Sequence, residues 1–302
     1  MIAYRYDSSF EGLLSAIFDA YTRKEFPEVL LSGDAALPLL ARSAHNVAFS
    51  ESKASRVFMG LRRRLSRQGQ NALVQVWLSE VEGSDMLLFR FMRKVFDAPQ
   101  QEFSPDGNGI ESHFTDTDVL AVSRISQQVG RETHLLLGFA RFAKTIDGVY
   151  VAVVRPRYNV LTLMLHHFAG RFGAQKWIVY DAGRGYGFLH DAGSFHEVAL
   201  DDALIRSGSL DASLFAEGET ELRDMWCSYF DAATIHERIN PRLQRRCMPS
   251  RFWPYMLETQ SERMGAATVV QAPLRPDVRV RGKVDQSPVR AAGYVPNGLH
   301  QS

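Results

Sequence analysis

The chain has 302 residues, of which 45% are hydrophobic and 23% are charged, a composition typical of a soluble globular protein. Its 35 basic residues balance 34 acidic ones, so a nucleic-acid surface would have to come from local clustering of charge. Two cysteines without CxxC spacing, Cys227 and Cys247, argue against a disulfide framework and exclude a zinc site built from cysteine pairs. The sequence has no secretory signal pattern and no apolar run of membrane-spanning length, so we expect a cytoplasmic protein with no membrane partner.

The first part of the chain predicts a strand followed by helices. Residues 2–7 alternate in the manner of a strand, and residues 10–25 repeat apolar side chains at helical spacing. Residues 51–98 show the same helical spacing almost throughout. The expected caps are Asp7, Ser8 or Ser9 before the first helix, and the expected helix breaks are Gly69 and Gly83.

After a polar loop over residues 99–114, the pattern predicts alternating helices and strands. Thr115 or Thr117 is the expected cap of a long helix that continues to residue 145, and Asn159 is the expected cap of a later one. The remaining expected elements are a strand over 148–156, a helix over 159–173, a hairpin of 176–181 with 185–191, a strand over 195–200 and a helix over 219–240.

Together these elements predict an α/β or α+β fold, with helices layered on a mixed, partly antiparallel sheet. We expect residues 1–260 to form a single globular domain. Residues 261–302 are rich in Pro, Gly and Arg and poor in periodic apolar residues, which predicts a disordered basic tail.

His167, Arg171 and Asp181 form the first candidate site. His167 and Arg171 are four residues apart on the predicted helix, so they share a face, and Asp181 ends the apolar run of the next strand. They could form a phosphate-binding or acid/base cluster, with His167 and Asp181 as the catalytic groups. The alternative is structural: a histidine bonded to the backbone and an arginine paired with a carboxylate. No HExxH or HxxxH spacing occurs, so we expect no metal, and no cofactor motif is present.

The stretch 238–258 is the second candidate site, because it combines five arginines with aromatic side chains. Guanidinium groups bind phosphates and aromatic rings stack on exposed bases, so this composition favours a nucleic-acid contact. The alternative is that the aromatic residues, Phe252 and Trp253 above all, close the core. The candidate nucleic-acid-binding residues are Arg171, Arg238, Arg242, Arg245, Arg251, Trp253 and Tyr255.

Three blocks of sequence carry a family resemblance: residues 4–27, residues 131–191 and residues 226–258. The HF-x-x-RF segment of the second block and the MP-x-R-aromatic-W segment of the third are the most specific. Together they resemble a bacterial family of probable DNA metabolism proteins that contain a domain of unknown function. The resemblance implies association with a radical-SAM protein for DNA modification or repair, and in other proteins fusion to a uracil-DNA glycosylase-type domain. It assigns no catalytic residue.

This chain has no CxxxCxxC motif, so it does not itself hold the iron–sulfur cluster of a radical-SAM enzyme. The leading hypothesis is therefore an accessory nucleic-acid-binding component of a DNA repair or modification system, with DNA and the radical-SAM protein as partners. One alternative is an enzyme that processes nucleotides or nucleic acids with the His/Asp/Arg cluster. Another is a scaffold that docks the partner enzyme through an apolar patch.

Overall fold

A computed structural model of the chain describes residues 1–33, 35–39, 41, 43–99, 109–201, 204–206 and 209–259. The chain divides into two compact units, with the boundary between Gly130 and Arg131. Each unit is described by itself below. The single globular domain expected over 1–260 stays a prediction, and the expected tail over 261–302 lies outside the described residues.

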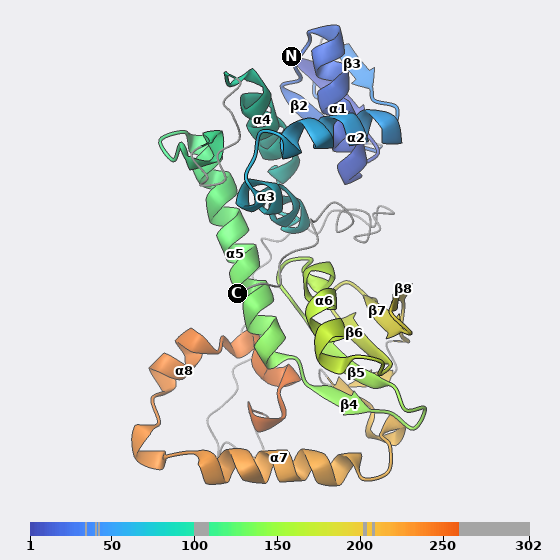
Figure 1. The fold of residues 1–302 in the computed structure, drawn as a ribbon, viewed down its shortest axis with the longest axis vertical. Coiled ribbons are helices and arrows are strands. Elements are labelled where there is room, and N and C mark those ends of the chain that lie inside the picture. Colours follow the sequence, from blue (N-terminus) through green and yellow to red (C-terminus); the bar gives the residue numbers. More distant parts are fainter. Residues whose placement is uncertain are drawn as a thin grey trace. The chain divides into compact units, whose positions relative to one another are not determined.

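The first unit contains a small parallel sheet in the order β2-β1-β3, and its two outer strands are labelled in Figure 1. Its central strand pairs in parallel with both neighbours, so that Tyr4 lies opposite Leu30 on one side and His45 on the other. The strands are β1 (Ile2–Tyr6), β2 (Val29–Ser32) and β3 (Ser43–Asn46). The helices are α1 (Phe10–Arg23), α2 (Glu51–Arg62), α3 (Arg67–Leu78) and α4 (Ser84–Asp97), followed by the 3-10 turn η1 (Ile110–Ser112) and the start of α5 (Thr117–Phe139).

Capping side chains explain where these helices begin. Ser9 caps α1, as expected, by accepting a hydrogen bond from the Gly12 backbone N–H at 2.8 Å. Gly83, with φ of 77°, precedes α4 and confirms the second predicted break. The break predicted at Gly69 is wrong, because Gly69 lies inside α3, where its N–H donates to the capping Ser66.

The long helix α5 differs from its prediction at both ends. Neither Thr115 nor Thr117 provides the cap, because the Asp116 carboxylate accepts from the backbone N–H groups of Asp118 and Val119, at 2.9 and 3.2 Å. The helix then runs unbroken to Phe139 and does not reach residue 145, because the chain enters a strand at Phe142.

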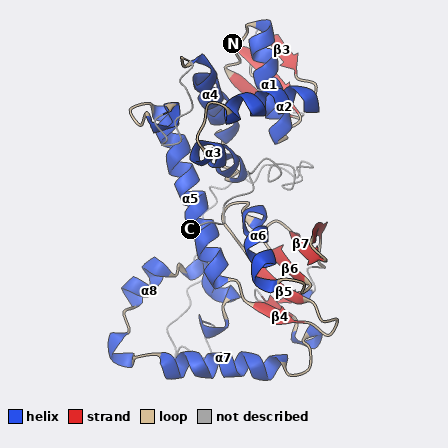
Figure 2. Cartoon of the chain, viewed as in Figure 1, coloured by secondary structure: helices blue, strands red, loops and turns tan. Residues whose placement is uncertain are grey.

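The second unit is built on a five-stranded mixed sheet in the order β4-β5-β6-β7-β8 (Figure 2). β5 and β6 are parallel and the crossover between them contains α6, which packs on β6 and β7, whereas the other pairs are antiparallel. The strands are β4 (Phe142–Lys144), β5 (Tyr150–Val154), β6 (Trp177–Asp181), β7 (Tyr186–Asp191), β8 (Ser194–Val198) and the short pair β9 (Ile205–Arg206) and β10 (Ser209–Leu210). These sheets and helices confirm the predicted mixed α/β class.

Aromatic side chains hold α6 (Leu161–Phe172) against this sheet. Phe168 is buried, with its ring centroid 5.0 Å from Phe142 and 5.9 Å from Trp177. Each such pair adds about 0.5–1.5 kcal/mol beyond simple burial. Asn159 is not the cap of α6, as its sequence position suggested, because its side-chain oxygen accepts from the Tyr186 hydroxyl instead.

Helical segments complete the second unit. α7 (Glu219–Ala233) ends seven residues before the predicted end, and a 3-10 turn, η4 (His236–Arg238), follows it. The later segments are α8 (Pro241–Cys247), η5 (Ser250–Tyr255) and η6 (Leu257–Thr259). α8 is only two turns long, and it begins where Asn240 caps the Leu243 N–H and Pro241 fixes the first helical residue.

Candidate nucleic-acid interface

Asp181 ends β6 and is fully buried beneath the turn that leads into β7. One of its oxygens accepts from the backbone N–H groups of Gly183 and Arg184, at 2.8 and 3.2 Å, and the other accepts from the Arg184 guanidinium at 2.9 Å. Burial raises the pKa of the Asp181 carboxyl, and the Arg184 charge only partly opposes that rise. Since both oxygens are already bonded, Asp181 serves to build the turn.

The topology separates Asp181 from the basic end of α6. α6 returns the chain from the carboxyl end of β5 to the amino end of β6, while Asp181 lies at the carboxyl end of β6. The rise from Leu161 to Arg171 is about 15 Å, so Arg171 lies toward the amino end of the strands, away from Asp181. His167 is half-buried between these two ends, with its ring 5.5 Å from Phe168.

Arg251 is held by a buried carboxylate. Its guanidinium pairs with Glu132 of α5, whose side chain is almost completely buried, and it also lies 4.4 Å from the centre of the Phe252 ring. The second oxygen of Glu132 accepts from the Arg157 backbone N–H at 2.8 Å. Arg251 therefore anchors η5 to α5, although almost half of its side chain stays exposed.

Four arginines on η4 and α8 are exposed to solvent. Within the part of the chain that the structure describes, none of them has a carboxylate oxygen within ion-pair distance. They are Arg238, Arg242, Arg245 and Arg246. Exposed guanidinium groups without a carboxylate are available to bind phosphate oxygens. We call these four residues the α8 arginines, and their role in binding nucleic acid stays a prediction.

The two aromatic candidates of η5, Trp253 and Tyr255, are only partly exposed. Trp253 is half-buried and donates its indole N–H to the Met248 carbonyl at 2.9 Å. Burial raises the pKa of the Tyr255 hydroxyl, while the neighbouring Arg155 charge lowers it. Phe252 and Met256 are completely buried, as expected if the aromatic residues close the core.

Sequence reasoning did not select Arg155 and Arg157, which are exposed in the loop after β5. The loop lies at the carboxyl edge of the parallel β5–β6 pair, the edge at which open α/β sheets bind their ligands. Arg184 fixes the loop by donating to the carbonyls of Pro156 and Arg157, at 3.2 and 3.1 Å. The available signal was two arginines flanking a proline directly after a buried strand.

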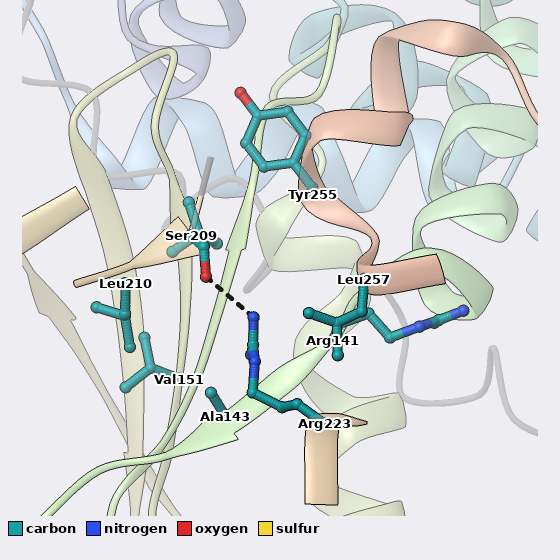
Figure 3. Close-up of a pocket in the computed structure, with 9 residues that line it drawn as sticks. Arg141, Ala143, Val151, Ser209, Leu210, Arg223, Tyr255 and Leu257 are labelled. Carbon is teal, nitrogen blue, oxygen red and sulfur yellow. Dashed lines mark hydrogen bonds between the residues drawn. The ribbon is translucent and has the colours of Figure 1, made fainter. Parts of the chain in front are cut away.

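A small cavity lies between β5, β10 and α7 in the second unit (Figure 3). Arg223 of α7 points toward Ser209 and donates to its hydroxyl at 3.4 Å, whereas the Arg141 guanidinium is bound to Glu258. Burial lowers the pKa of Arg223, partly offset by the nearby Glu219. The cavity holds about 20 Å³, room for about one water molecule, so a nucleotide does not enter it.

The described residues contain neither a metal-binding cluster nor a membrane-spanning helix. Among them there is no group of three or more His, Cys, Asp or Glu side chains placed to hold a metal ion. No helix in the same residues is long and apolar enough to cross a bilayer.

Comparison with known proteins returns one family. No curated protein and no solved structure matches the chain. A family described as a domain of unknown function, DUF4130, matches residues 82–258, more than half of the chain. The match ends at Glu258, so it includes α7, the α8 arginines and η5. It supports the part of the sequence resemblance that concerns a domain of unknown function, whereas DNA metabolism and the radical-SAM association rest on the resemblance alone. The chain therefore belongs to the DUF4130 family.

Proposed function

We propose that this protein is an accessory nucleic-acid-binding component of a DNA repair or modification system that works with a radical-SAM partner. The observation that carries the proposal is the set of α8 arginines, exposed and without carboxylates within the described residues. The nature of the system and of the partner is supported by the resemblance of the sequence. The whole chain is almost neutral, so its affinity for DNA would have to come from this local cluster.

The arginines differ in how readily they can bind phosphate. The α8 arginines need no bond broken before they bind, whereas Arg251 would first have to share or leave Glu132. Arg155 and Arg157 are also exposed and could contact a second stretch of backbone. Each arginine that neutralises a phosphate of duplex DNA releases condensed counterions. The slope of the logarithm of the association constant against the logarithm of the salt concentration then becomes more negative by about 0.9.

The enzyme alternative has less support from the geometry. It requires Asp181 as an acid or base, yet both oxygens of Asp181 are bonded within its own turn. A general acid or base must come within hydrogen-bond reach of the group on which it acts.

The test is charge reversal of two α8 arginines, Arg242→Glu with Arg245→Glu. The control is Arg62→Glu with Arg63→Glu, which makes the same charge change at two exposed arginines of the first unit. We would measure binding to fluorescently labelled single- and double-stranded DNA by anisotropy over a series of salt concentrations. The α8 double variant should lose about 100-fold in affinity at low salt, and its salt slope should fall in magnitude by about two.

The control pair should bind as the unaltered protein does. An equal loss in both double variants would show that only net charge matters, and unchanged binding in the α8 variant would remove this stretch from the interface. Either result would refute the proposal.

A further inference from the structure

α7 carries an apolar stripe that faces solvent. Four large side chains on it, Leu222, Met225, Trp226 and Tyr229, are between 40% and 66% exposed. Their spacing of three and four residues places them on one face of the helix. Cys227, on the other side of the same helix, is buried, and the Trp226 indole N–H at the edge of the stripe is bound to Glu258. α7 therefore packs on its own unit through one face and leaves its more apolar face uncovered.

Three further apolar side chains, each about half exposed, follow α7 in the chain: Ile235, Ile239 and Leu243. We call these seven residues the apolar face. With each large side chain covering about 150–250 Å², half exposure of seven leaves on the order of 600 Å² uncovered. Monomeric soluble proteins rarely expose more than that in one patch.

We infer that a second copy of this chain covers the apolar face, with the two α7 helices packed antiparallel across a two-fold axis. A standard interface buries about 800 Å² on each partner, and the apolar face with its polar rim approaches that size. A two-fold axis pairs a surface with itself, so the surface must be self-complementary. The four residues of the stripe are uncharged, which meets this condition.

The charges next to the stripe decide the direction of the two helices. Glu221 flanks the stripe near its amino end. In a parallel pair the two Glu221 carboxylates would lie side by side. In an antiparallel pair centred between Met225 and Trp226 they lie about 13 Å apart along the axis, at 1.5 Å per residue. That separation exceeds the Debye length of about 8 Å at physiological salt. Leu222 of each copy then packs against Tyr229 of the other.

The first test is the mass of the full chain in solution, measured by sedimentation velocity and light scattering over a hundredfold range of concentration. We expect a species of twice the chain mass of 34.0 kDa. Met225→Glu places two carboxylates at the centre of the contact and should weaken the dimer at least 100-fold. Thr220→Glu adds the same charge on the opposite side of α7, at an exposed position, and should leave the dimer intact.

A cross-link tests the geometry independently. Cys247 is exposed, so the background variant is Cys247→Ser. In that background, Met225→Cys should form a disulfide-linked dimer under mild oxidation, and Thr220→Cys should not.

Three results would overturn the inference. The full chain could be a monomer at every concentration, or Met225→Glu could leave the dimer unchanged. The third is a monomer in which amide exchange shows α7 protected, which would mean that another segment or another protein covers the face.

Discussion

Substitution of Glu258 measures how much its ion pair with Arg141 stabilises the second unit. Glu258 is buried in η6, where its two oxygens bind the Arg141 guanidinium and one also accepts from the Trp226 indole N–H at 3.2 Å. Glu258→Gln removes the negative charge with almost no change in shape. Breaking a buried pair costs about 3–5 kcal/mol when the remaining charge is left uncompensated.

The expected loss is smaller than that, about 2–3 kcal/mol, because Arg141 is not fully buried and keeps a bond to the Gly138 carbonyl at 2.8 Å. For a unit of this size, that loss lowers Tm by roughly 5–10 °C. The matched control is Asp191→Asn, which breaks the exposed pair with Lys176 in the same unit and should cost under about 1 kcal/mol. Thermal and urea unfolding followed by circular dichroism measure both.

The effect of Glu258→Gln should depend on pH. Burial raises the pKa of Glu258, but the Arg141 and Trp226 donors outweigh burial and hold the pKa below its ordinary value of 4.5. A carboxyl with a depressed pKa stabilises the fold above its unfolded-state pKa and loses this contribution as the pH falls through the folded-state pKa. The difference between the two proteins should therefore be full at neutral pH and shrink below about pH 4.5. A loss equal to that of Asp191→Asn, or one independent of pH, would refute the reasoning.

Two further predictions concern backbone positions in the same sheet. A Cβ at Gly187 of β7 would lie 2.5 Å from the Val179 carbonyl oxygen. Gly187→Ala should therefore destabilise the protein by about 2 kcal/mol or more, measured by urea unfolding. An unchanged midpoint of urea unfolding would contradict this prediction. Ala192 has a left-handed φ of 48° in the two-residue turn between β7 and β8, so Ala192→Asn should stabilise by about 0.5–1 kcal/mol, and a lowered Tm would show that the turn does not limit this hairpin.

The sequence predicted most of the elements because their periodicity is strong. The strand ending at Tyr6, the hairpin of β6 and β7, and the helices around residues 10–25 and 51–98 follow from apolar spacing alone. Cap positions were less predictable. Asp116 and Thr117 are neighbours with equally suitable side chains, and only the structure shows which one reaches the N–H groups of the next turn.

The residue types of the candidate site could be predicted from the sequence, but the ion pairs that these residues form could not. The arginines of residues 238–251 could be selected by type, yet nothing local in the sequence indicates that Arg251 pairs with Glu132, 119 residues earlier, while Arg242 stays exposed. The exposure of the stripe on α7 could not be predicted from the sequence either. The spacing of the stripe is that of an ordinary core-facing helix, so the pattern alone does not reveal that this face is uncovered.

The two long-range ion pairs can form only late in the synthesis of the chain. Glu132 and Arg141 leave the ribosome more than 100 residues before their partners, Arg251 and Glu258. At about 5–20 residues per second, that delay is on the order of 6–25 s. During that interval the strands of the second unit are synthesised, but the residues that complete the two ion pairs are still missing. A message truncated before codon 251 would therefore yield a chain that cannot complete this unit, however intact its earlier strands and helices are.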